Sequence, residues 1–263
     1  MENKRLEVTG TGLKVIAVVT MLIDHIAFAA QVNGIFDYYY PVLMAKGINP
    51  QLLYWIMRGI GRLAFPIYCY LLVEGFFYSR NLLKYGLRLF ATAIFAEIPF
   101  DLVLKRQIFD FTSNNVLWEL LLGLIVLYVI KSIQNWKEPF AKSNRSTQVA
   151  KVVAVVTVIA LGMILAQVLG LDYGYTGIAC IVTMYLMHSA TDKARSIKGF
   201  IYGVIWLTAL SSVLEIVALI DVVPLFNYQG RRGRDSKALR WFFYLFYPVH
   251  LCVLYIVVQI IIN

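Results

Sequence analysis

The chain has 263 residues, of which 60% are hydrophobic and 15% are charged, and its mean hydropathy is +0.71. This composition excludes a soluble globular domain and indicates a polytopic membrane protein. The net charge of +9 does not predict a nucleic-acid partner, because the lysines and arginines lie mostly in short gaps between apolar runs, as in the positive-inside pattern. The three cysteines lie far apart inside apolar runs, which is typical of packing residues.

The hydropathy pattern predicts an all-α fold, a polytopic bundle of about eight transmembrane helices in a single domain over residues 1–263. The expected spans are 13–31, 53–78, 84–104, 115–131, 150–169, 174–190, 199–221 and 240–262. We interpret the first as an uncleaved span and not as a signal peptide, since Asp24 and His25 would interrupt the apolar region of a signal. The fifth span has little polar character and is expected to face lipid.

The distribution of cations favours a cytoplasmic N-terminus, because more lysines and arginines then fall on the inner side. One gap breaks this pattern, since it is strongly basic and is expected on the outer side. Its cations are Arg231, Arg232, Arg234, Lys237 and Arg240. Two explanations stay open: the gap has a function, or a segment in the second half is re-entrant and the predicted sides are reversed after it.

The first span carries the most informative residues. Leu13 to Gln31 would extend over roughly 28 Å, close to the thickness of a bilayer core. Asp24 and His25 lie deep within it, and ionisable groups at that depth face a protein interior or a wet cavity and are functional by default. Lys14 is eleven residues before His25, so both share one helix face, about 16 Å apart along it.

Charged pairs also occur in the next two spans. Arg58 and Arg62 are one turn apart and need an anion, either a carboxylate on a neighbouring helix or a ligand phosphate or carboxylate. Glu97 and Asp101 are likewise one turn apart and require a cation or a proton between them; Arg58 or Arg62 would suit, which would give a buried ion-pair network.

A basic cluster lies where the second span meets the third. Its residues are Arg80, Asn81, Lys84 and Arg88. The positive-inside pattern is a strong explanation of the cluster, and the cluster could also hold a phosphorylated cytosolic cofactor near a helix N-terminus. In the last span, His250 is expected at the same depth as His25. No third ligand has suitable spacing, so we expect no metal and favour general acid–base catalysis.

Several blocks together resemble the TraX family of bacterial membrane proteins, whose named member acetylates the N-terminus of conjugative pilin. They include Gly61, Arg62, Ala64, Phe65, Pro66; Glu97, Ile98, Pro99, Phe100, Asp101; and Tyr247, Pro248, His250. That family is in turn similar to the broader transmembrane acyltransferases, which carry an arginine and a histidine eleven residues apart on the first span. Here the first of these positions is Lys14 and the second is His25.

The resemblance implies a membrane acetyltransferase, in a bacterial inner membrane with a cytoplasmic N-terminus, that moves acetyl from cytosolic acetyl-CoA to an extracytoplasmic protein amine or glycan hydroxyl. His25 would be the general base, oriented by Asp24 or another carboxylate, and Arg62, Tyr247 or His250 would stabilise the oxyanion. Acetyl-CoA would contact Lys14, Arg80, Asn81, Lys84 and Arg88, joined by Arg231 and Arg232 if their gap is cytoplasmic.

Two other classes of function are alternatives. A transporter or flippase would use the buried charges as a proton relay, but it would be expected to show an internal repeat, and the sequence shows none. In a structural membrane subunit the same charges would only fix how helices pair. The sequence leaves the acceptor and the oligomeric state open.

Overall fold

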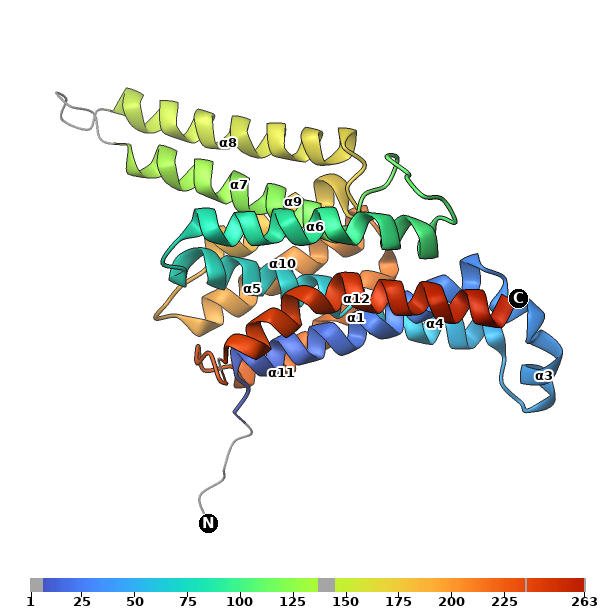
Figure 1. Cartoon of the computed structure of the whole chain (residues 1–263). Coiled ribbons are helices and arrows are strands. Elements are labelled where there is room, and N and C mark those ends of the chain that lie inside the picture. The colour runs from blue at the N-terminus through green and yellow to red at the C-terminus, as the bar shows by residue number, and fades with distance from the viewer. Residues whose placement is uncertain (1–6, 137–144, 235, 263) are drawn as a thin grey trace, which may run out of the picture.

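The computed structural model describes residues 7–136, 145–234 and 236–262, and its regular elements are all helical (Figure 1). In chain order they are α1 (Gly10–Val32), α2 (Ile35–Tyr38), α3 (Tyr40–Ala45), α4 (Pro50–Gly61), α5 (Ala64–Tyr78), α6 (Leu82–Leu104), α7 (Val116–Asn135), α8 (Arg145–Val168), α9 (Gly174–Met187), α10 (Lys193–Leu210), the 3-10 helix η1 (Val213–Asp221), α11 (Val222–Asn227) and α12 (Lys237–Ile262). The predicted all-α polytopic bundle is confirmed.

Five segments of the described chain are long and apolar enough to cross a membrane. They are α1, the α4–α5 segment, α7, α8 and α12. The α4–α5 segment is not one continuous helix, because it breaks at Arg62 and Leu63. Pro66 explains the break, since it has no N–H to donate to the carbonyl of Arg62 one turn before it.

The predicted span 199–221 is wrong as a single helix. Helix α10 ends at Leu210, and after Ser211 and Ser212 the chain continues as η1 and α11. The Ser212 hydroxyl accepts a hydrogen bond from the N–H of Leu214, so it caps a new element instead of continuing the old one. A nine-residue 3-10 helix and a six-residue α-helix together cover about 27 Å, close to a bilayer core.

Residues 213–227 therefore return along the bundle and bring the basic gap to the end where the chain begins (Figure 1). The N–H of Val8 donates to the carbonyl of Asn227 at 3.1 Å, and the N–H groups of Gly10 and Thr11 donate to the carbonyls of Arg231 and Arg232 at 2.9 and 3.0 Å. The predicted sides are wrong after α10, because the basic gap lies at the same end of the bundle as the start of α1 and not at the opposite end.

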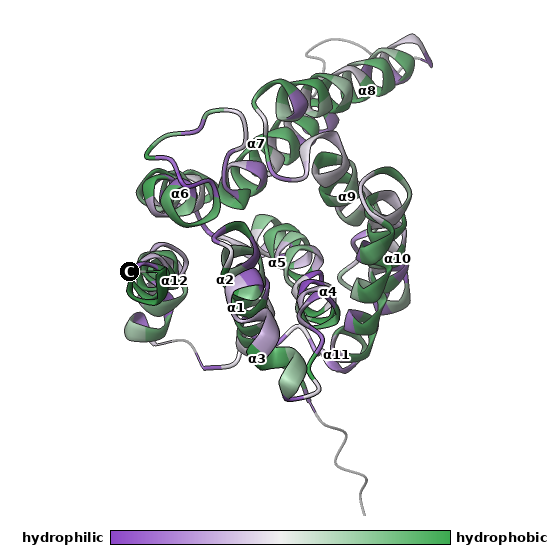
Figure 2. Cartoon of the chain, turned by 90° about the vertical axis from the view of Figure 1, so that its right-hand side faces the viewer, coloured by the Kyte–Doolittle hydropathy of each residue, from purple (hydrophilic) through white to green (hydrophobic). Residues whose placement is uncertain are grey.

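Helix α1 packs against α4, α5, α6 and α12. Figure 2 views the bundle from one end and shows α6, α7, α9, α10 and α12 in an arc around α1, α4 and α5, with α8 outside α7 and α9. The buried residues of α8 are Gly162 and Ala166, which fits its expected contact with lipid.

The closest approach between α1 and α4 is at Gly61. A Cβ added to Gly61 would overlap the carboxyl group and the Cβ of Asp24, whereas a Cβ added to Gly59 would have its nearest neighbour, a Leu214 methyl, at 3.8 Å. The missing side chain of Gly61 thus brings α1 and α4 close enough for the ion pairs described below.

We predict that Ser236→Cys, in a chain whose exposed Cys252 is replaced by alanine, reacts with an impermeant maleimide from the same side of the membrane as Thr191→Cys. The reason is that Lys193 Nζ donates to the carbonyl of Phe226, which links the α9–α10 turn to the end of α11. Lys46→Cys, in the α3–α4 turn, should react from the opposite side. If the Ser236→Cys and Lys46→Cys variants react from the same side of the membrane, the described path of η1 and α11 is contradicted.

We also predict that Gly61→Ala destabilises the protein while Gly59→Ala does not. An alanine in a helix with room for its methyl group is neutral or stabilising by about 0.4–1 kcal/mol, but at Gly61 it must displace Asp24. Thermal unfolding in detergent, followed by tryptophan fluorescence, measures both variants under the same conditions. Equal unfolding temperatures for the two would show that α1 and α4 are not in close contact at this position.

Candidate functional site

Two histidines from the first and last helices meet inside the bundle. His25 Nδ1 lies 2.6 Å from His250 Nε2, and the two rings are nearly parallel, with an interplanar angle of 6° and centroids 5.0 Å apart. The other ring nitrogen of His250, Nδ1, lies 2.8 Å from the carbonyl oxygen of Phe246 one turn before it. Tyr247 packs edge-on against both rings.

Beside this pair, two arginines of the α4–α5 segment join α1 to η1. Asp24 accepts hydrogen bonds from Arg58 at 2.5 Å and from Arg62 at 2.8 Å. Arg62 also reaches Glu215 at 3.0 Å, and the Glu215 side chain is 1% exposed. The anions that the two arginines require are therefore carboxylates on neighbouring elements.

The expected pairing of Arg58 or Arg62 with Glu97 or Asp101 is wrong. Glu97 accepts hydrogen bonds from the Trp118 indole N–H at 2.6 Å and from the Asn115 amide, and Asp101 accepts one from the backbone N–H of Asp110 at 2.8 Å. This face of α6 is turned towards α7 and the α6–α7 connection. The two arginines are instead paired with Asp24 and Glu215.

Asp24 has a different role from the one expected. Its oxygens are taken by Arg58 and Arg62, and among the described residues no hydrogen bond joins it to the ring of His25. Adjacent residues of a helix point about 100° apart, so Asp24 faces α4 while His25 faces α12. The expectation that Asp24 or another carboxylate orients His25 is corrected, because the partner of its ring is His250.

A cavity of about 50 Å³ adjoins His25. It is lined by Met21, Asp24, His25, Gly61, Arg62, Ala64, Phe65, Tyr68, Val116, Asp172 and Tyr173. Asp172, in the connection between α8 and α9, is the exposed member of this lining, so the cavity approaches the surface at the end of the bundle away from the N-terminus. A cavity needs about 10–15 Å³ of such volume to hold one water molecule, so this cavity admits a group of only a few atoms.

The hydroxyl of Tyr247 is another feature of this region. Tyr247 is 4% exposed, and its oxygen has no hydrogen-bond partner within the described chain. A buried hydroxyl without a partner is costly, and such groups are expected to have a function or an unseen partner. The Tyr247 hydroxyl beside the histidines is therefore not committed to another described residue.

The residues expected to hold the cofactor lie at the N-terminal end of the bundle. They are Lys14, Arg80, Asn81, Lys84, Arg88, Arg231 and Arg232. Lys14 lies over the ring of Phe243 at 5.5 Å and Arg88 over that of Tyr244 at 6.0 Å, which connects α1 and α6 to α12. Asn81 caps α6 by accepting a hydrogen bond from the N–H of Lys84 at 2.8 Å, so its side chain already has a structural role.

Two residues of this region are not predicted as site residues from the sequence. Glu215 looks like a lone polar group in an apolar run, but it is an ion-pair partner of Arg62. Tyr173, whose ring stacks on Phe65 with centroids 3.7 Å apart, lines the cavity. The signal that could have found Tyr173 is its position beside Asp172 in a short polar segment between two glycines.

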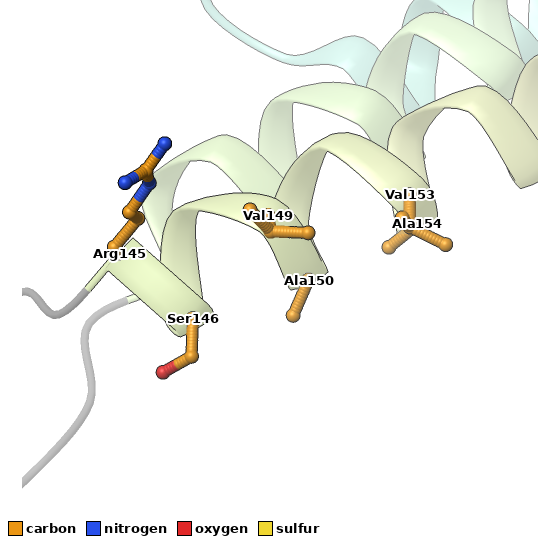
Figure 3. A pocket seen from close by; sticks show the side chains of 6 residues that line it. All are labelled: Arg145, Ser146, Val149, Ala150, Val153 and Ala154. Carbon is orange, nitrogen blue, oxygen red and sulfur yellow. The ribbon is translucent and has the colours of Figure 1, made fainter.

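A second hollow, of about 660 Å³, lies along α8. Figure 3 shows that Arg145, Ser146, Val149, Ala150, Val153 and Ala154 line it, all from this one helix. It lacks the convergent polar groups that a binding site for a polar ligand needs. Within the described chain, no group of three or more His, Cys, Asp or Glu side chains is placed to hold a metal ion.

We predict that Asp24→Ala destabilises the protein by about 3–5 kcal/mol, because it leaves the Arg58 guanidinium in the bundle without its carboxylate and leaves Arg62 with Glu215 alone. Asp37→Ala, on the exposed short helix α2, is the matched control and should have little effect. Unfolding temperatures of the purified variants in one detergent give the comparison. Similar values for the two variants would remove Asp24 from the interactions that hold α1 in place.

Comparison with known proteins identifies the family. The chain is 28% identical over 272 residues to the probable fimbrial assembly protein FimC, serogroup H1, of Dichelobacter nodosus, and the match covers 96% of each chain. No solved structure matches. The family model described as TraX protein matches residues 9–258, so this chain belongs to the TraX family.

Proposed function

We propose that this protein is a membrane-embedded acetyltransferase that moves acetyl from acetyl-CoA to an acceptor on the other side of a bacterial inner membrane. The observation that carries the proposal is the position of His25, whose ring faces a protein-lined cavity between a basic end and an acidic end of the bundle. Membership of the TraX family and similarity to a fimbrial assembly protein support the same activity.

The basic end is suited to the donor. Most lysines and arginines of the described residues gather there; the others are Lys46, Arg58, Arg62, Lys105 and Arg106. A cytoplasmic location of this end agrees with the positive-inside rule. The phosphates of acetyl-CoA would bind Lys14, Arg88, Arg231 and Arg232, with Arg80 and Lys84 nearby. The pantetheine arm would then follow α1 from Lys14 to His25, about 16 Å along the helix.

The cavity beside His25 is suited to a short acyl group. The cavity is small, which suits an acetyl group better than a long acyl chain. His25 would remove a proton from the acceptor as the acceptor atom attacks the thioester carbonyl carbon. Tyr247 would donate to the developing oxyanion. The new bond to the acceptor forms as the carbon–sulfur bond breaks, and the proton passes to the thiolate of coenzyme A.

The acidic end is suited to an amine acceptor. Asp172 is exposed at the cavity, and Asp24, Glu119 and Glu215 are buried around it. Asp24 and Glu215 are paired with Arg58 and Arg62, whereas neither Asp172 nor Glu119 forms an ion pair with another described residue. An ammonium group would complement the excess of carboxylates, so the proposal favours a protein N-terminus over a glycan hydroxyl.

The test is acetyl transfer by the full-length protein in lipid nanodiscs, with labelled acetyl-CoA and a peptide amine. We expect His25→Ala to lower the turnover by about 100-fold or more while acetyl-CoA still binds, because the variant removes the base and not the basic end. His188→Ala is the matched control, since His188 pairs with Glu74 away from the cavity. Rates are compared per folded molecule, as measured by size-exclusion chromatography.

Retained turnover in His25→Ala would contradict the role of this histidine. Failure of coenzyme A to bind the wild-type protein, judged by mass spectrometry of the complex, would contradict the activity itself.

A further inference from the structure

The hydrogen bonds around His250 determine which of its nitrogens carries the proton. A carbonyl oxygen only accepts hydrogen bonds, so the 2.8 Å contact between His250 Nδ1 and the carbonyl of Phe246 requires a proton on Nδ1. A neutral imidazole has one N–H, so Nε2 of a neutral His250 carries a lone pair and accepts. Among the described residues, no carboxylate is hydrogen-bonded to either ring of the pair, so neither has a counter-charge in contact.

The same logic extends to His25. The 2.6 Å contact between its Nδ1 and Nε2 of His250 needs one proton, and Nε2 of His250 has none to give. The proton must therefore be on Nδ1 of His25, which leaves the lone pair on Nε2. This is the only nitrogen of the two rings that is not engaged in a hydrogen bond within the described chain.

We infer that His250 is a positioning residue that holds His25 in the Nδ1–H tautomer, so that Nε2 of His25 is the atom that takes the proton from the acceptor. The inference rests on the proposed acetyl transfer and deepens it. His250 here has the role that a buried aspartate has in a serine protease triad, where the partner of the histidine fixes its tautomer and orientation. The partner in this protein is a neutral ring.

This assignment corrects the expectation that His250 stabilises the oxyanion. Both of its ring nitrogens are already committed, one to Phe246 and the other to His25, so neither is available to the substrate. When His25 gains a proton on Nε2, its Nδ1–H still points at the lone pair of His250, so the bond persists in both protonation states and becomes charge-assisted.

The test uses two amide substitutions that reproduce different nitrogens of His250. In His250→Gln the amide can take the place of Nε2 and accept from His25, while in His250→Asn the shorter amide takes the place of Nδ1 and reaches only Phe246. We expect kcat of the asparagine variant to fall by about 100-fold or more and that of the glutamine variant by less than about tenfold. KM for acetyl-CoA should stay unchanged in both, because the basic end is intact.

A second measurement does not depend on activity. The ¹⁵N spectrum of histidine-labelled protein, with the three histidines assigned by substitution, should show a protonated Nδ1 and an unprotonated Nε2 for His25. The asparagine variant should lose this signature and the glutamine variant should keep it.

A proton on Nε2 of resting His25, or equal kcat values for the two variants, would overturn the inference while leaving the proposed activity standing. Absence of acetyl transfer by the wild-type protein would instead remove the proposed activity, and the spectrum would still decide the tautomer.

Discussion

The site depends on the ion pairs that Arg58 and Arg62 form with Asp24 and Glu215. These two arginines, one helical turn apart, bind a carboxylate of α1 on one side and one of η1 on the other. Buried ion pairs contribute little net stability, but they are costly to break one partner at a time, so they act mainly to fix one arrangement of helices. Here the fixed arrangement includes the rotation of α1 about its axis.

The rotation of α1 determines what His25 can do. Because Asp24 is held towards α4, the next side chain in the helix is turned towards α12, where it meets His250. The absence of a side chain at Gly61 is part of the same constraint, since any larger residue would push Asp24 from its position. Asp24 belongs to the ion-pair network and the adjacent His25 belongs to the histidine pair, so the two residues of α1 have different partners.

Much of the fold follows from the sequence, but the sequence does not decide how the helices are paired. Long apolar runs such as α8 and α12 are evident from hydropathy alone, and the cap at Asn115 follows from its position, since its side chain accepts from the N–H of Leu117. Residues 199–221 form one apolar run, and hydropathy does not distinguish a single helix from a helix, a break and a returning 3-10 segment. Because a single helix was predicted where the chain makes two passes, the basic gap was expected at the wrong end of the bundle.

The candidate site was also predictable only in part, because the sequence shows which residues are ionisable but not which of them the packing of the helices brings together. An ionisable pair such as Asp24 and His25 is conspicuous in an apolar span wherever the neighbouring helices lie. The partners of Arg62 were not, because Asp24, Glu97, Asp101 and Glu215 are all carboxylates within reach of some packing of the helices. Only the packed bundle decides among them.

The two imidazoles that meet in this protein are 225 residues apart in the sequence. His25 belongs to α1 and His250 to α12, and the backbone bonds of Gly10 and Thr11 to Arg231 and Arg232 join the same distant regions. The pair can therefore form only after the residues that separate the two histidines have been synthesised and α12 has joined the bundle. Copies whose synthesis stops before α12 carry no assembled pair.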